Sequence, residues 1–141
     1  MPKPNILLLV TDQHRYDCLG VNGHPFLQTP NLDRLASEGV NFSQAYTPAP
    51  ICVPSRTSML YGQWSTRHLA IANTDTEAPR SVRQGLTPFS SLLRQDGYHL
   101  DWIGKWGISL DITPYDVGFH SYNSDIHYTQ WRAEQGFQPK P

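Results

Sequence analysis

A continuous apolar run near the start of the chain, Ile6–Val10, constrains the fold most. A run that is apolar at every position, bounded here by Asn5 and Thr11, is typical of a strand buried on both faces, as in a parallel sheet covered by helices. It is far too short to span a membrane and lacks the small-residue cleavage site of a signal peptide. We therefore expect an α/β fold built on a mainly parallel sheet.

Helices that would cover this sheet are expected wherever the chain carries helix start and stop residues. Thr29–Gly39 and Thr87–Gly97 each begin with Thr-Pro and end at a glycine, and a third helical pattern runs from Pro54 to Tyr61 before Gly62. A capping Thr, a Pro at the first helical position and a Gly after the last turn are the usual signals. Two further strands are expected over Val40–Tyr46 and Tyr98–Trp106, and a surface loop over 63–86.

The composition favours one soluble globular unit. The chain has 141 residues, of which 38% are hydrophobic and 16% charged, and its formal net charge is -1. A charge balance this close to neutral shows no footprint for nucleic acid or for a membrane surface. The two cysteines, Cys18 and Cys52, form no disulfide framework. Since no signal peptide is seen, we expect a cytoplasmic protein, or a periplasmic or secreted one if a leader has been removed.

The stretch from Pro50 to Gly62 carries the strongest chemical signal. Cys52 is expected just before a helix whose first position is Pro54, and a helix N-terminus has unpaired N–H groups and partial positive charge that favour an anion. Arg56, about one turn further along, adds a fork of donors. These features predict a site for an oxyanion such as sulfate or phosphate. The alternative is a small buried cysteine beside a solvated arginine.

Polar residues also follow two of the expected strands. Asp12 and Gln13 come after the first strand, and Lys105 lies at the end of the last. Ligands in open α/β sheets bind beyond the carboxyl ends of the strands. A carboxylate beside an amide oxygen suits a hard cation such as calcium. Each of these residues, taken alone, is also what an ordinary solvated loop contains.

The sequence Cys-Val-Pro-Ser-Arg over residues 52–56 resembles the Cys-x-Pro-Ser-Arg signature of the sulfatases. Two further landmarks match in the same order, Thr-Pro-Asn-Leu-Asp-Arg-Leu-Ala from Thr29 and Gly-Lys-Trp from Gly104. The resemblance runs from Asn5 to about Phe119. It implies a three-layer, alkaline phosphatase-like α/β fold, of which residues 1–141 form the N-terminal part of the catalytic domain, with the C-terminal part absent.

The resemblance also implies a mechanism. In sulfatases a maturation enzyme oxidises the signature cysteine, here Cys52, to formylglycine. The hydrate of that residue attacks the sulfur of a sulfate ester, which is a small molecule or a carbohydrate. Arg56 and Lys105 match residues that contact the sulfate. Asp12, Gln13 and residue 52 match the ligands of a divalent metal, usually Ca²⁺.

Two departures from the family pattern keep other interpretations open. Gly107 stands where sulfatases usually have a His that donates to the formylglycine, and losing such a donor costs a factor of about a hundred or more in rate. The chain is also much shorter than a sulfatase. One alternative is a phosphonate or phosphate ester hydrolase of the same superfamily, and another is a truncated, non-catalytic fragment. Arg67 and His68 match a family position near the substrate, with a weak signal.

Overall fold

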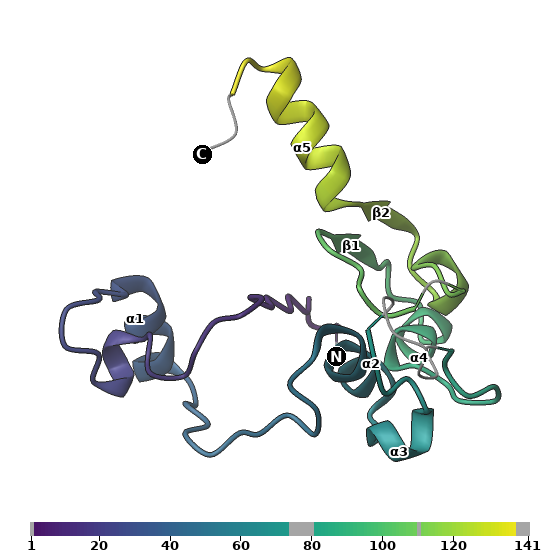
Figure 1. Cartoon of the computed structure of the whole chain (residues 1–141), viewed down its shortest axis with the longest axis horizontal. Coiled ribbons are helices and arrows are strands. Elements are labelled where there is room, and N and C mark those ends of the chain that lie inside the picture. Colours follow the sequence, from purple (N-terminus) through teal and green to yellow (C-terminus); the bar gives the residue numbers. More distant parts are fainter. Residues whose placement is uncertain (1, 74–80, 110, 138–141) are drawn as a thin grey trace. The chain divides into compact units, whose positions relative to one another are not determined.

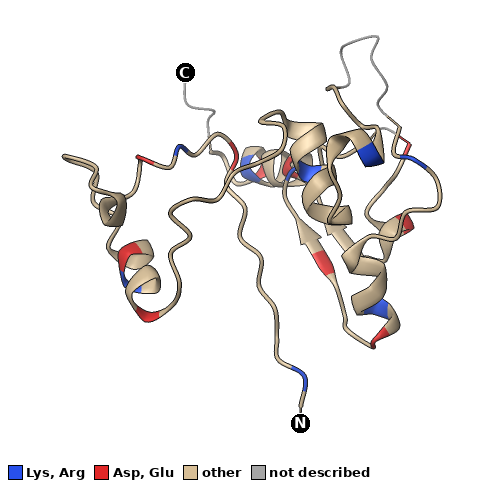
Figure 2. Ribbon diagram, turned by 90° about the horizontal axis from the view of Figure 1, so that it is seen from below, with Lys and Arg blue, Asp and Glu red and all other residues tan. Residues whose placement is uncertain are grey.

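The computed structural model describes residues 2–73, 81–109 and 111–137, which form two units, Met1–Tyr46 and Thr47–Pro141 (Figure 1). Each unit is described by itself. Lys and Arg are interspersed with Asp and Glu along the ribbon of both units (Figure 2). Within the described residues, no helix has both the length and the apolar character that a membrane crossing requires.

The first unit is organised around the helix α1, Pro30–Glu38, which confirms the helix predicted over 29–39. Thr29 lies at its N-cap position, but the side chain does not cap the helix. Its Oγ1 instead accepts a hydrogen bond from the Gly20 amide (2.8 Å) and donates to Asp33 Oδ1 (2.7 Å). The same Asp33 oxygen accepts from the Val21 amide at 2.8 Å. These bonds fix the short 3-10 helix η1, Gly20–Asn22, to the start of α1.

The strands predicted over 5–11 and 40–46 are wrong in this structure. Neither run is assigned to a strand, and their apolar side chains are exposed: 81% for Leu7 and 75% for both Val40 and Phe42. A strand needs a neighbouring strand to pair its backbone N–H and C=O groups. In the described part of this unit no strand lies beside either run, so the apolar pattern has nothing to pack against.

The second unit contains most of the regular structure. Its helices are α2 (Cys52–Tyr61), α3 (Ser65–His68), α4 (Phe89–Gln95), the 3-10 helix η2 (Tyr115–Val117) and α5 (Asp125–Glu134). Two strands, β1 (Asp101–Ile103) and β2 (Ser121–Asn123), pair in parallel with Trp102 opposite Tyr122. This parallel pair agrees with the α/β class that the sequence predicts. The helix α4 begins one residue later than expected, and β1 is shorter than the range 98–106.

The core of this unit joins α2 to the segment that follows β1. Its buried members are Leu60, Tyr61, Leu100, Trp106, Ile108, Val117 and Phe119. The Trp102 ring packs edge-on against Trp106, with centroids 4.8 Å apart, and against Phe119 at 5.4 Å. Burial of these large side chains is the main stabilising force here. Because Leu60 and Ile108 lie in one cluster, the core fixes residues 104–108 beside α2.

A Leu60→Ala substitution is expected to lower the free energy of unfolding by about 2–5 kcal/mol, because Leu60 is fully buried and truncation leaves a cavity. Urea unfolding followed by circular dichroism measures the loss. Leu92→Ala makes the same chemical change on α4, where the side chain is 54% exposed, and should change stability by less than about 0.5 kcal/mol. Equal losses in the two variants would contradict the placement of the core.

Candidate active site

The helix α2 begins at Cys52, two residues earlier than the sequence predicts. Ile51 is its N-cap residue, and the Ser55 amide donates to the Ile51 carbonyl at 2.9 Å. Pro54 is therefore the third helical residue rather than the first. A proline is tolerated there because the amides of the first turn have no partner within the helix. Cys52 thus lies inside the first turn, and the helix ends as predicted at Gly62, whose φ is 61°.

The N-terminus of α2 offers fewer backbone donors than the sequence argument assumes. The Val53 amide donates to Asn73 Oδ1 at 3.2 Å, and Pro54 has no N–H. Within the described residues, Cys52 is then the first-turn position whose amide is left to face a ligand. A helix N-terminus with one such amide is a weak anion site. Positive charge near residue 52 must therefore come from side chains.

Lys105 supplies one of those charges. Its Nζ donates to Cys52 Sγ at 3.5 Å, although the two residues are 53 positions apart in sequence. The Gly104 amide donates to the Asn123 carbonyl at 2.8 Å, directly after β1 ends at Ile103. Lys105 therefore follows the carboxyl end of a parallel strand, as predicted. Its side chain is exposed and that of Cys52 is half-buried.

Arg56 connects α2 to the same segment. Its Nη1 donates to the Lys105 carbonyl at 2.7 Å and lies 3.4 Å from the Trp106 carbonyl. One turn of helix separates Arg56 from Cys52, so both project from the start of α2. The structure thus brings together Cys52, Arg56 and Lys105, the three residues that the sequence assigns to catalysis.

Gly107 lies within this cluster. A Cβ atom built on it would be 3.3 Å from Arg56 Cδ and 3.4 Å from Lys105 Cε. Its φ of 55° is in the left-handed region, where residues with side chains are strained. The position that departs from the family pattern therefore faces both basic side chains. A side chain at position 107 would contact them directly.

Asp12 and Gln13 belong to the first unit and are exposed there. Gln13 has a φ of 57°, which is uncommon for a non-glycine residue. Carboxylate and amide oxygens fit a hard cation, but Ca²⁺ takes six to eight ligands and these two residues supply only part of that set. Among the described residues there is no group of three His, Cys, Asp or Glu side chains that could hold a metal.

A buried histidine lies beside α2, and neither its burial nor its contact with the helix was predicted from the sequence. His68 ends α3, inside the range expected to be a surface loop, and is fully buried. Its Nδ1 accepts from the Ala70 amide at 3.2 Å, and its Nε2 is 2.9 Å from Ser58 Oγ. Since an amide can only donate, the neutral ring carries its proton on Nε2 and donates it to Ser58. The weak match of Arg67 and His68 to a family position was the only signal for this residue.

Burial lowers the pKa of His68, which predicts a loss of stability in acid. The unfolded chain takes up this proton near pH 6.5, while the folded chain resists it to a lower pH. The free energy of unfolding should therefore fall as the pH drops below about 6.5, by at most about 1.4 kcal/mol per pH unit. Urea unfolding at pH 7.5 and 5.5 measures this change. His68→Gln should lose less stability than the wild type between these pH values, and an equal loss in both proteins would contradict the role of His68.

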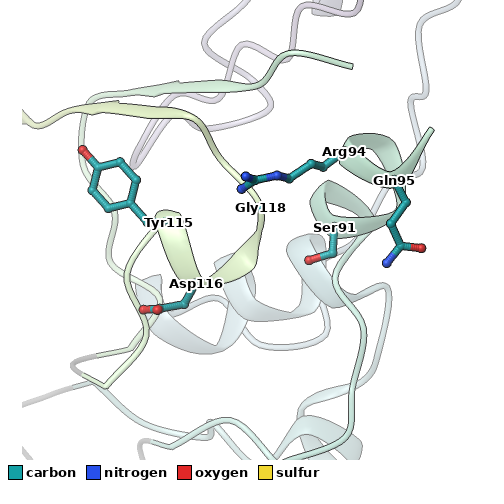
Figure 3. A pocket seen from close by; sticks show the side chains of 6 residues that line it. All are labelled: Ser91, Arg94, Gln95, Tyr115, Asp116 and Gly118. Atoms are coloured by element: carbon teal, nitrogen blue, oxygen red, sulfur yellow. The ribbon is translucent and has the colours of Figure 1, made fainter. Parts of the chain in front are cut away.

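A groove between α4 and η2 contains none of the predicted site residues (Figure 3). It is lined by Ser91, Arg94, Gln95, Tyr115, Asp116 and Gly118. Asp116 accepts from both the amide and the hydroxyl of Thr113, which lowers the pKa of its carboxyl group. The Ser91 hydroxyl donates to the Val117 carbonyl at 3.1 Å. These groups hold the fold together, so we assign no site to the groove.

Comparison with known proteins identifies the family. The family model described as Sulfatase matches residues 4–139, nearly the whole chain. The chain belongs to the sulfatase family. This membership confirms the alkaline phosphatase-like α/β fold that the sequence predicts, and the small parallel sheet fits an incomplete domain of that fold.

The two curated relatives described here are named sulfatases, and each is longer than this chain. The arylsulfatase of Clostridium perfringens is 45% identical over 103 residues, which cover 73% of this chain and 21% of that protein. The N-acetylgalactosamine-6-sulfatase of Mus musculus is 38% identical over 111 residues, with the same coverage. The crystal structure of Ps i-CgsB has a TM-score of 0.78 at 30% identity, covering 99% of this chain and 34% of that one. A structure solved in complex with its substrate D-glucosamine-2-N,6-O-disulfate has a TM-score of 0.72 at 30% identity, covering 86% and 23%. This sulfatase chain thus spans about a fifth of the length of the curated relatives.

Proposed function

We propose that this chain supplies the nucleophile-bearing part of a sulfatase active site and that the protein hydrolyses sulfate esters. The observation that carries the proposal is the contact between Lys105 Nζ and Cys52 Sγ, with Arg56 bonded to the backbone beside Lys105. A half-buried thiol in contact with an ammonium, with a guanidinium bound to the same segment as that ammonium, is suited to handling an anionic group. Membership of the sulfatase family supports a sulfate ester as that group.

In this proposal residue 52 is the nucleophile, and the two basic residues stabilise and position the reacting groups. Residue 52, once oxidised to formylglycine by a maturation enzyme and hydrated, supplies the oxygen nucleophile. Lys105 holds positive charge where negative charge develops on the transferring group, and in many enzymes such stabilisation accelerates the reaction more than any other effect. Arg56 adds charge and also fixes Lys105 through that residue's carbonyl. Gly107 adds no side-chain donor, so the charged side chains of the cluster are those of Arg56 and Lys105.

A divalent metal, Ca²⁺ by preference, is part of the proposal. Asp12, Gln13 and residue 52 would hold it together with ligands from elsewhere in the protein. The donor chemistry of Asp12 and Gln13, a carboxylate beside an amide oxygen, supports this assignment. When bound, the metal would act as a Lewis acid on the sulfate group.

The substrate we propose is a carbohydrate sulfate ester. Two solved relatives carry carbohydrates in their titles, the glucosamine disulfate named above and, for Ps i-CgsB, k-i-k-neocarrahexaose. A non-catalytic role is the second candidate. It is favoured by Gly107, which adds no side-chain donor to the cluster, and by the apolar runs of the first unit, whose side chains are exposed.

Intact mass and peptide mapping of the protein purified from its native host test the proposal. An aldehyde at position 52, together with turnover of an aryl sulfate in preference to the matching aryl phosphonate, is the expected result. Preference for the phosphonate would move the protein to the phosphonate or phosphate ester hydrolases. An unmodified thiol at position 52 with no turnover of either ester would leave the non-catalytic role.

A further inference from the structure

Asn73 makes the contact that holds the backbone next to Cys52. Its side-chain Oδ1 accepts the hydrogen bond from the Val53 amide at 3.2 Å. Val53 is 3% exposed, so this amide lies away from water and needs a protein acceptor. An unsatisfied buried amide costs roughly 1–3 kcal/mol. Asn73 therefore satisfies the first-turn donor closest to the reactive residue.

The need for Asn73 follows from the sequence at the start of α2. A helix is usually capped by the side chain of its own N-cap residue, and Ser, Thr, Asp and Asn are preferred there. The N-cap residue of α2 is Ile51, which has no polar side chain and makes no capping bond. The cap is instead supplied from 20 positions further along the chain.

The segment that carries Asn73 is anchored to α2 at a second point. His68 and Ser58 are joined by a hydrogen bond of 2.9 Å, and both residues are buried. The Ala70 amide donates to His68 Nδ1, which fixes the chain just before Asn73. The two bonds to α2, at Val53 and at Ser58, span the part of the helix that carries Arg56. Segment 68–73 thus holds the helix from its first turn to beyond its middle.

We propose that Asn73 is a positioning residue, which fixes the first turn of α2 and so holds residue 52 beside Lys105 Nζ. By occupying the Val53 amide, it also keeps that donor from the transferring group. The inference deepens the proposed sulfatase function and rests on it. A displacement of the reacting atom by about 1 Å can cost a factor of about a hundred in rate.

Asn73→Ala and Asn73→Asp separate positioning from general stability. The alanine variant loses the acceptor, so kcat should fall about 10- to 100-fold with KM within threefold of the wild-type value. The aspartate variant keeps an acceptor at the same place. It should retain kcat within about threefold while raising KM, because its charge repels an anionic substrate. Asn31→Ala on α1 removes an exposed asparagine and should leave both constants unchanged.

Two readouts need no turnover and so remain informative if the protein is not a sulfatase. Hydrogen exchange at the Val53 amide should become faster in Asn73→Ala and stay slow in Asn73→Asp. On the unmodified chain, iodoacetamide should label Cys52 several-fold faster relative to Cys18 in the alanine variant, with Cys18 as the internal reference. Far-UV circular dichroism checks that each variant is folded.

The possible results test the role of Asn73 separately from the proposed sulfatase function. Unchanged Val53 exchange and an unchanged Cys52-to-Cys18 labelling ratio in Asn73→Ala would overturn the role of Asn73, whatever the activity. Wild-type kcat in a folded alanine variant of an active enzyme would do the same while leaving the sulfatase proposal intact. If the wild type has no turnover, the sulfatase proposal fails, and the exchange and labelling results still decide whether Asn73 fixes residue 52. If Asn73→Ala does not fold, the test depends on Asn73→Asp. Slow exchange at the Val53 amide together with retained kcat in that variant supports the positioning role of Asn73, and loss of either overturns it.

Discussion

A Cys52→Ala variant of the protein from its native host is expected to lose sulfate ester hydrolysis by a factor on the order of 10,000 or more. In the proposed mechanism residue 52 supplies the nucleophile, and removal of a nucleophile leaves only what binding and electrostatic groups contribute. Initial rates with an aryl sulfate, at saturating and at low concentration, measure the loss in kcat and in kcat/KM. The fold should survive, because the first-turn bonds of α2 at Val53 and Ser55 do not involve the Cys52 side chain.

Cys18→Ala is the matched control for this experiment. It removes the other cysteine, which is also half-buried but lies in the first unit, and it should retain wild-type kcat. Turnover by Cys52→Ala within tenfold of the wild type would contradict the assignment of the nucleophile. Equal losses in both cysteine variants would point to a requirement for thiols in folding rather than in catalysis.

The helices α1, α2 and α4 could be predicted because their signals are local, whereas α3 lies in the range expected to be a loop and α5 was not predicted. Thr29, Pro30 and Gly39 bracket α1, and the structure places its ends within a residue of the prediction. The left-handed residue Gly62 ends α2 for the same reason, since only its own backbone conformation is involved. The first helical residue of α2 was missed by two positions because a proline fits any of the first-turn positions.

The strands could not be predicted from local signals alone. The run Ile6–Val10 has the composition of a buried strand, yet burial depends on which neighbours lie beside it, and the described residues provide none. β1 forms because β2 pairs with it, 20 residues further along the chain, and it ends where that partner ends. The apolar pattern therefore indicates what a segment can do in a larger sheet, not what it does in this chain.

The residues of the candidate site also differ in whether local sequence signals predict their positions. Cys52 and Arg56 lie on one helix, so their proximity follows from spacing alone. Lys105 comes beside them only because the core joins Leu60 to Ile108, and here the family resemblance supplied what spacing could not. Nothing in the sequence indicated the contacts of His68 and Asn73, because each is a single polar residue in a stretch without periodicity. Asp12 and Gln13 remain predictions, since they belong to the other unit.

A Lys105→Met variant is expected to reduce kcat about 100- to 1,000-fold, the usual cost of removing one preorganised charge or donor at a developing anion. Methionine keeps the unbranched stem and removes the ammonium that contacts Cys52 Sγ. Stability should stay within about 0.5 kcal/mol of the wild type, because the side chain is exposed. The Lys105 carbonyl oxygen, which accepts from Arg56 Nη1 and from Trp102 Nε1, is retained in the variant. Steady-state kinetics and urea unfolding on the same preparation measure the two effects.

Two lysine variants serve as controls for this result. Lys105→Arg restores positive charge but replaces a compact ammonium with a planar fork, so it should recover part of the lost rate, to within about tenfold of the wild type. Lys3→Met makes the same chemical change in an exposed segment of the first unit and should leave kcat unchanged. A Lys105→Met enzyme with kcat within threefold of the wild type would remove Lys105 from the site. Of the two basic side chains, only Arg56 would then stabilise charge beside residue 52. In that case we expect Arg56→Gln to show the 100- to 1,000-fold fall in kcat that Lys105→Met did not show.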